Sequence, residues 1–194
     1  MAVDCNAEGQ INVYNVATAK NDFSSLTTAV RVALFGSPTG GSAIKYLIFD
    51  HSVSETPNVV GVGGPVYDDA TKSQQNENAV NTTSALIYND EVWENHVTLH
   101  ELFHALGATQ GQLNPKAPSL TSGYHCSDGI DMLCYYDGTG FYSESSSPES
   151  SGYYSPTTVP IDCKKDTYFD AVPTPETWLA ENWNLGDREN WFFV

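Results

Sequence analysis

The pair of histidines at positions 100 and 104 constrains this chain more than any other feature of its sequence. The residues His100-Glu101-Leu102-Phe103-His104 are followed directly by Ala105-Leu106-Gly107. On a helix, side chains four residues apart lie on one face, one turn above the other. His100 and His104 can therefore direct two imidazole nitrogens to one metal ion, with Glu101 beside them to take a proton from a water on that ion. The sequence predicts a helix that carries two metal ligands and a general base.

The residues that flank the two histidines predict that this helix is buried. Apolar side chains leave few polar faces on it: Val97, Leu99, Leu102, Phe103, Ala105 and Leu106. A helix that is apolar nearly all round lies inside a protein, where unpaired ionisable groups are expensive. In a chain with 5 histidines, this HExxH pattern has roughly a 1% chance of arising by accident. A bound metal ion explains it better than two solvated histidines.

Composition restricts the partners of the chain. Its 194 residues, 40% of them hydrophobic, are enough for one domain with a real core, and we expect a single domain over residues 1–194. It carries 24 acidic against 8 basic residues and a net charge of -16. This charge argues against nucleic acid and against an anionic membrane surface as partners. No apolar run approaches the roughly 20 residues of a membrane-spanning helix, and we expect a soluble monomer.

The four cysteines predict an exported protein with two disulfides. Cys5, Cys126, Cys134 and Cys163 form no CxxC pair, so a cysteine zinc ribbon is not expected. Three pairings are open; we favour Cys126–Cys134, a short loop beside the metal site, with Cys5–Cys163 tying down the N-terminus. Because no apolar segment follows Met1, we expect that a signal peptide has been removed and an initiator methionine added. The predicted location is secreted, extracellular.

Periodic patterns predict the elements before the metal-binding helix. Alternation over residues 11–16 predicts a half-buried strand. Helical spacing over residues 22–35, ended by Gly36, predicts a helix. The apolar run 46–49 is expected to be a central strand. Residues 50–83 are expected to be mostly loop, residues 84–88 a short strand, and Asn89-Asp90 the cap of the metal-binding helix.

Regular structure is harder to identify after Gly107. Residues 143–155 hold seven serines and are expected to form a surface loop. Thr174-Pro175-Glu176 has the residues of a helix start, and the helix is expected to run to about residue 182 with Trp178 and Leu179 packed inward. The predicted fold is α+β: a small mixed sheet and the active-site helix in residues 1–107, and an irregular, disulfide-tied half in residues 108–194.

The order of these elements and the motifs of the second half resemble zincin proteases. Gly107 matches the metzincin pattern HExxHxxGxxH, whose last position is Gln110 here. The chain more closely resembles secreted microbial metalloprotease-like proteins with the motifs HELxHxLGAxQ, HCxDxxDxMCY and DCxxDDYF. The matching segments are HELFHALGATQ (100–110), HCSDGIDMLCY (125–135), DCKKDTYF (162–169) and TWLAENWN (177–184). This resemblance implies a metzincin-like fold and a zinc-dependent peptidase.

The resemblance points to His125 as the third zinc ligand. The other two histidines are His51 and His96, and His96 lies four residues before His100. Three ligands stacked on one straight helix cannot all converge on a tetrahedral ion, which argues against His96. Asp128, Asp131 and Gln110 remain alternatives, since carboxylates also bind zinc and a glutamine amide is a poorer ligand.

The segment 131–135 resembles the metzincin Met-turn, a hydrophobic floor below the metal. When residues 125–135 are aligned with the motif HCxDxxDxMCY, Leu133 stands at the position of the motif's methionine, and Met132 lies one residue before it. Tyr135 lies where some metzincins carry a tyrosine that hydrogen-bonds the oxyanion, so it is a candidate catalytic residue. A tyrosine that only packs in the core is an equal alternative.

Acidic residues accompany these motifs and raise the question of a second metal. They are Asp128, Asp131, Asp137, Asp162 and Asp166. Oxygen-rich loops of this kind can bind calcium, but the spacing of an EF-hand is absent. A Ca²⁺ ion beside the one catalytic Zn²⁺ is therefore a secondary expectation, and solvated acidic side chains are the simpler interpretation.

The leading hypothesis is a secreted zinc endopeptidase that acts on a protein or peptide substrate, with Glu101 as the base. The alternative is a catalytically inactive binding protein on a zincin scaffold, with structural zinc. Three protein ligands and an open fourth position favour the enzyme, whereas four protein ligands favour the scaffold. A gluzincin-type site with Glu176 or Glu181 as a ligand is a third option, which Gly107 and the 125–132 segment disfavour.

Overall fold

A three-stranded mixed sheet forms the first part of the structure. The computed structural model describes residues 7–8, 10, 12–17, 22–39, 44–52, 59–64, 76–88, 95–110, 123–126, 131–134, 161–162 and 164–187. The strands are β1 (Lys45–Asp50), β2 (Gly61–Gly64) and β3 (Thr83–Tyr88), in the order β1-β3-β2. β1 runs parallel to β3, and β2 runs antiparallel to it. The predicted small mixed sheet of an α+β protein is confirmed.

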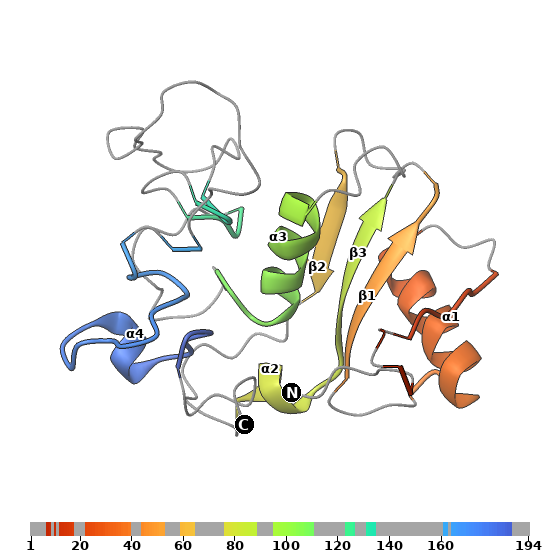
Figure 1. The fold of residues 1–194 in the computed structure, drawn as a ribbon, viewed down its shortest axis with the longest axis horizontal. Helices are drawn as coiled ribbons and strands as arrows, with labels where there is room; N and C mark the ends of the chain where they lie inside the picture. Colours follow the sequence, from red (N-terminus) through yellow and green to blue (C-terminus); the bar gives the residue numbers. More distant parts are fainter. Residues whose placement is uncertain are drawn as a thin grey trace.

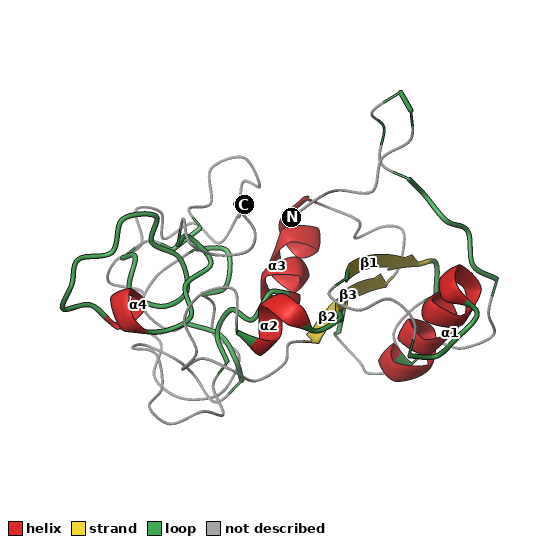
Figure 2. Cartoon of the chain, turned by 90° about the horizontal axis from the view of Figure 1, so that it is seen from below, coloured by secondary structure: helices red, strands yellow, loops and turns green. Residues whose placement is uncertain are grey.

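The central strand β3 is buried on both faces because a helix packs on each side of it. Leu86 and Tyr88 lie in a core cluster with Leu26 of α1 (Phe23–Phe35). On the other face, the Thr83 hydroxyl donates to the carbonyl of Ala105, the last residue of α3 (Asn95–Ala105). Successive side chains of a strand point to opposite faces. Figures 1 and 2 show the resulting order, with the sheet between α1 and α3.

Helix α1 begins and ends at the residues that its sequence predicts. The Asp22 carboxylate accepts the N–H of Ser25 at 2.9 Å, which is the usual N-cap bond. At the other end Gly36 has φ 67° and donates its N–H to the Val32 carbonyl at 2.8 Å. A left-handed residue after the last turn favours glycine. The predicted helix over residues 22–35 is confirmed.

A second core lies on the side of α3 that faces away from the sheet. We call the described residues 123–126, 131–134, 161–162 and 164–187 the loop region; its one helix is α4 (Trp178–Glu181). Its buried side chains join the end of α3 and the short helix α2 (Glu77–Val80) in one cluster: Ala79, Leu106, Ala108, Cys126, Leu133, Cys134, Tyr168, Trp183 and Leu185. The Trp183 indole N–H donates to the Leu106 carbonyl at 3.0 Å. This cluster attaches the loop region to α3.

Two strand predictions are wrong. Residues 12–17 form no strand, and Val13 is 81% exposed, so the alternating pattern there has no buried face to support it; Ile11 lies outside the described residues. β1 is an edge strand of the described sheet and not its central strand. The centre is β3, whose Ser84 and Ala85 are small enough for helices to pack on both faces. The apolar run of β1 gave no sign of this.

The elements missed or misplaced by sequence patterns are short. Residues 50–83 contain β2 and α2 in addition to loop. The predicted helix start at residues 174–176 is wrong, because α4 begins at Trp178 after the N-cap Thr177. The N–H and hydroxyl of Thr177 both donate to the Thr174 carbonyl, at 3.0 and 2.8 Å. Pro175 thus lies in a turn, where its fixed φ suits the second position. Leu179 is fully buried, as predicted.

The predicted link between Cys126 and Cys134 is present as a disulfide, with the two Cα atoms 4.3 Å apart. Cys5 and Cys163 lie outside the described residues, as do the serine-rich segment 143–155 and the expected cap at residues 89–90. Within the described part of the chain, no helix has the length and apolar character needed to cross a membrane.

Candidate metal centre

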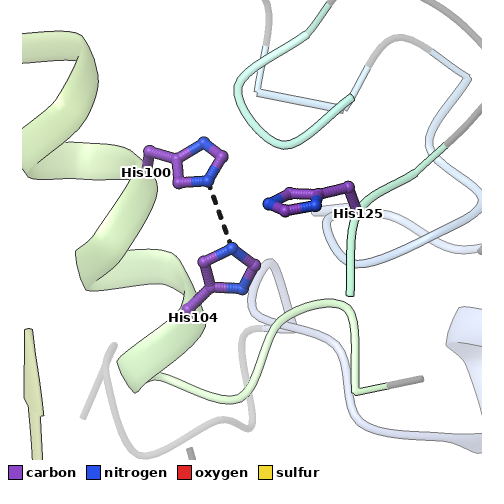
Figure 3. A group of neighbouring side chains, drawn as sticks. All are labelled: His100, His104 and His125. Carbon is purple, nitrogen blue, oxygen red and sulfur yellow. Dashed lines mark hydrogen bonds between the residues drawn. The ribbon is translucent and has the colours of Figure 1, made fainter. Parts of the chain in front are cut away.

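Helix α3 places the imidazoles of His100 and His104 beside each other. Their ring centroids are 4.8 Å apart, and the planes meet at 77°. The two Nε2 atoms are 3.2 Å apart, and Figure 3 shows both turned toward the same point. Two nitrogens bound at about 2.05 Å to one tetrahedral zinc ion would lie about 3.3 Å apart. The spacing therefore fits two ligands of one ion.

His125 completes a group of three imidazoles. It approaches from the opposite side to α3 (Figure 3), with its ring centroid 5.3 Å from that of His100 and 5.2 Å from that of His104. One ligand nitrogen from each of the three rings lies within 4.8 Å of the others, in a geometry that could hold a metal ion. Tyr124, just before His125, has φ 68°, which is uncommon for a bulky residue. The three predicted ligands thus lie together.

Hydrogen bonds on the outer nitrogens fix how the two helix histidines point. The Nδ1 atom of His100 is 2.7 Å from the Met132 carbonyl. His104 makes a backbone hydrogen bond with Ala108, and its Nδ1 lies 3.2 Å from the Thr109 hydroxyl. When Nδ1 carries the proton and donates it to a carbonyl, the lone pair is on Nε2 and is available to a metal. The hydrogen bonds on the outer side of both rings are compatible with this tautomer.

Burial keeps these two imidazoles neutral. The pKa of His100 is lowered to about 3, chiefly by burial and then by the neighbouring His125. The pKa of His104 is also lowered well below its ordinary value by burial, with further contributions from His100 and His125. Neutral imidazole is the form that binds a metal. Both residues are therefore ready to bind a cation at neutral pH.

The chain turns sharply after α3 at Gly107, as the glycine in the motif predicts. Gly107 has φ 92°, and its N–H donates to the His104 carbonyl at 2.9 Å. The N–H of Ala108 donates to the Phe103 carbonyl, also at 2.9 Å. This pair of bonds is the Schellman motif, which ends a helix with a left-handed residue. The turn carries Ala108 and Thr109 back toward the outer side of the His104 ring.

Glu101 lies between α3 and the edge strand β2. It is 8% exposed, and burial raises its pKa to about 8, against a backbone hydrogen bond from Gly63 that lowers it. The surroundings of the Glu101 carboxyl therefore bring its pKa close to neutral pH. A carboxyl with a pKa in that range can take and give a proton at neutral pH.

Glycines of β2 allow α3 to approach this closely. A Cβ atom added to Gly61 would lie 2.5 Å from Glu101 Cγ and 2.6 Å from its Oε1. One added to Gly63 would overlap His104 Cβ and the backbone carbonyl of Glu101. A larger residue at position 61 would displace the Glu101 side chain, and one at position 63 would push the helix away from the strand. The glycine-rich strand thus sets the depth of Glu101 and His104.

Of the alternative third ligands, Asp131 lies within the described residues and does not join the cluster of three histidines. The Gln110 side chain donates to the Gly107 carbonyl at 2.6 Å. Asp131 accepts from the Leu133 N–H and the Tyr168 hydroxyl, both at 3.0 Å. A second group of side chains that could bind a metal consists of Cys126, Asp131 and Cys134. Its two cysteines form a disulfide with each other, so their sulfur atoms are not thiolate ligands. Asp128 lies outside the described residues.

The remaining predicted residues have mixed outcomes. Met132 is 4% exposed and Leu133 is fully buried, and Leu133 packs in the core of the loop region. The contact between Met132 and the His100 ring is made by the Met132 carbonyl. Tyr135, the candidate oxyanion donor, lies outside the described residues, as does Asp137 of the acidic set. Calcium therefore remains an expectation from sequence.

Several supporting groups were not identified from the sequence. They are Gly61 and Gly63, the Met132 carbonyl, Tyr168 and Asp162. Asp162 accepts the backbone N–H groups of Thr167, Tyr168 and Phe169 at 3.1, 2.8 and 2.9 Å. The segment DCKKDTYF contains both Asp162 and Tyr168; the sequence indicated Asp162 only as part of an acidic set for calcium and predicted no role for Tyr168.

Comparison of the chain with protein-family models, with curated proteins and with solved structures finds no match.

Proposed function

We propose that this chain is a secreted zinc-dependent endopeptidase with a metzincin-like fold. One observation carries the proposal: a helix and a separate loop bring His100, His104 and His125 together around one point. Next to two of these ligands on the same helix lies Glu101, buried and with its pKa raised to about 8. Three imidazoles with one adjacent carboxyl are typical of catalytic rather than structural zinc sites.

The residues of the chain would divide the work as follows. His100, His104 and His125 would hold the zinc ion, and bound zinc would supply a Lewis acid that polarises the scissile carbonyl and makes water more acidic. Glu101 would accept a proton from the attacking water and pass it to the leaving amine. The Glu101 side chain is buried against β2, which would keep bulk water away from the carboxyl while it carries the proton. An adjacent cation would favour the ionised form of Glu101, the form that accepts the proton.

The neighbouring edge strand supports a peptide as the substrate. Among the described strands, β2 pairs with β3 only, and it lies directly beside Glu101. An extended peptide can add to an open sheet edge through backbone hydrogen bonds. The disulfide is compatible with the extracellular location that we propose.

The number of protein ligands bears on the alternative, a scaffold with structural zinc. Within the described ranges, three side chains of metal-binding type surround the point, not four. A structural zinc site has four protein ligands, whereas a catalytic one leaves a position for water or substrate. The three-ligand arrangement therefore favours the enzyme.

The variant Glu101→Gln tests the proposal. It keeps the size of the side chain and removes the proton acceptor. Zinc should stay bound at one ion per chain, and cleavage of an unbiased peptide library should fall at least about 100-fold. Zinc content measured in both forms controls for loss of the site. Equal cleavage by the two forms would exclude Glu101 as the base, and an inert wild type with full zinc would favour the scaffold.

A further inference from the structure

Tyr168 is the largest fully buried side chain of the loop region, and its hydroxyl is directed at the turn that supports the metal ligands. It is 1% exposed, and its ring packs against Phe103 of α3 with centroids 6.1 Å apart. The hydroxyl donates to Asp131 Oδ1 at 3.0 Å. A fully buried phenol that meets a buried carboxylate is a strong, charge-assisted contact.

Asp131 connects this hydroxyl to the turn 131–134. Its Oδ1 atom also accepts the N–H of Leu133 at 3.0 Å, so one carboxylate oxygen holds both the tyrosine and the turn backbone. Asp131 is 2% exposed. A buried carboxylate is stable only when donors satisfy it. Loss of the Tyr168 hydroxyl would therefore loosen the turn as well as the tyrosine.

The turn in its own right supports two of the three candidate ligands. The Met132 carbonyl is 2.7 Å from Nδ1 of His100. The Leu133 carbonyl accepts the N–H of Cys126 at 3.0 Å, and the disulfide to Cys134 joins the same residue covalently. Cys126 directly follows His125. A shift of the turn would thus move the partner of His100 and the neighbour of His125 together.

Tyr168 is itself held in place from the other side. The Asp162 carboxylate accepts the Tyr168 N–H at 2.8 Å, together with the two neighbouring N–H groups. Burial and then the carboxylates of Asp131 and Asp162 keep the pKa of the Tyr168 hydroxyl well above its ordinary value. The Tyr168 hydroxyl therefore stays protonated and acts as a donor. The residue is held at its backbone N–H by Asp162 and at its hydroxyl by Asp131.

We propose that Tyr168, acting through Asp131, is a positioning residue for the metal site: it fixes the turn 131–134 that orients His100 and His125. The inference rests on the metal site proposed above. Groups that orient metal ligands from outside are typically worth 10- to 100-fold in metal affinity.

The variant Tyr168→Phe tests this, because it keeps the ring and its packing and removes only the donor. Zinc affinity of the full chain, measured by competition with a chelator of known affinity, should fall roughly 10- to 100-fold. The matched control is Tyr46→Phe on β1: Tyr46 is also buried, at 7% exposure, but its hydroxyl has no hydrogen-bond partner among the described residues. The control should keep the wild-type affinity, and equal affinities in all three forms would overturn the proposal.

A second measurement works on metal-free protein. The Nδ1 proton of His100 should be observable by nitrogen-15 NMR, held against the Met132 carbonyl in the wild type and in Tyr46→Phe. In Tyr168→Phe it should exchange faster with water, or the ring should populate the other tautomer. An unchanged His100 signal would overturn the proposal. Because this readout needs no zinc, it decides the inference even if the wild type binds none, a result that would by itself refute the proposed metal site.

The pathway through Asp131 is tested by combining two variants. Asp131→Leu removes the acceptor that the two donors share and keeps a side chain of similar size. If Tyr168 acts through Asp131, the loss of zinc affinity caused by Tyr168→Phe should be smaller in the Asp131→Leu background than in the wild type. Fully additive losses would mean that Tyr168 acts by another route, which would contradict the proposal.

Discussion

The sheet and the loop region hold the same helix by different means. On the sheet side, α3 contacts β2 and β3 by close packing, and the absence of side chains at Gly61 and Gly63 is what allows it. On the loop side, single polar atoms do the positioning: the Met132 carbonyl on His100, and Asp131 on its turn. The first contact is sensitive to added volume, and the second to the removal of one hydrogen-bonding group. The candidate metal site lies where the two meet.

The largest expected effect concerns the candidate ligands, two of which lie on α3 and one in the loop region. His100→Ala, His104→Ala and His125→Ala should each reduce zinc from one ion per chain to near zero, because two imidazoles do not complete a zinc site. Elemental analysis after growth with zinc measures this, and His51→Ala, outside the cluster, is the control. Zinc retained in His125→Ala alone would mean that the loop region supplies no ligand.

A smaller effect is expected from added volume on the sheet side. Gly63→Ala should reduce the free energy of unfolding by about 3 kcal/mol, because its Cβ would overlap the backbone of Glu101 and the Cβ of His104. Urea denaturation of metal-free protein measures this. In the control Gly36→Ala the new Cβ meets nothing within 4 Å, and only the backbone strain of φ 67° remains, about 1 kcal/mol. Equal losses in the two variants would show that the helix does not depend on that close approach.

The smallest effect is expected from the disulfide of the loop region. Replacing both Cys126 and Cys134 by alanine opens a link with a sequence separation of 8, and should lower the free energy of unfolding by about 2–3 kcal/mol. Zinc affinity should fall as well, because His125 adjoins Cys126. Thermal unfolding and chelator competition measure the two effects. Adding reductant to the double variant separates any contribution of Cys5 and Cys163. If the double variant unfolds at the same midpoint temperature as the wild type, hydrogen bonds alone hold the turn.

The positions that the sequence predicted correctly depend on local chemistry. Helix α1 and its Asp22 and Gly36 caps follow from spacing and from two residue types. The turn at Gly107 follows from the one residue that readily adopts its φ of 92°. The pairing of His100 with His104 follows from the period of a helix. Each of these depends on residues no more than about one helical turn apart.

Only the tertiary structure decided which strand is central, where α4 begins and what supports the candidate ligands. β1 and β3 are both short apolar runs, and their order depends on helices that pack from elsewhere in the chain. The Tyr168 hydroxyl reaches Asp131 across 37 residues, and His100 reaches the Met132 carbonyl across 32. The sequence by itself determined that His100, Glu101 and His104 lie together on α3, because a helix fixes relations between near neighbours. Contacts between distant segments depend on how the whole chain packs, and no local pattern encodes them.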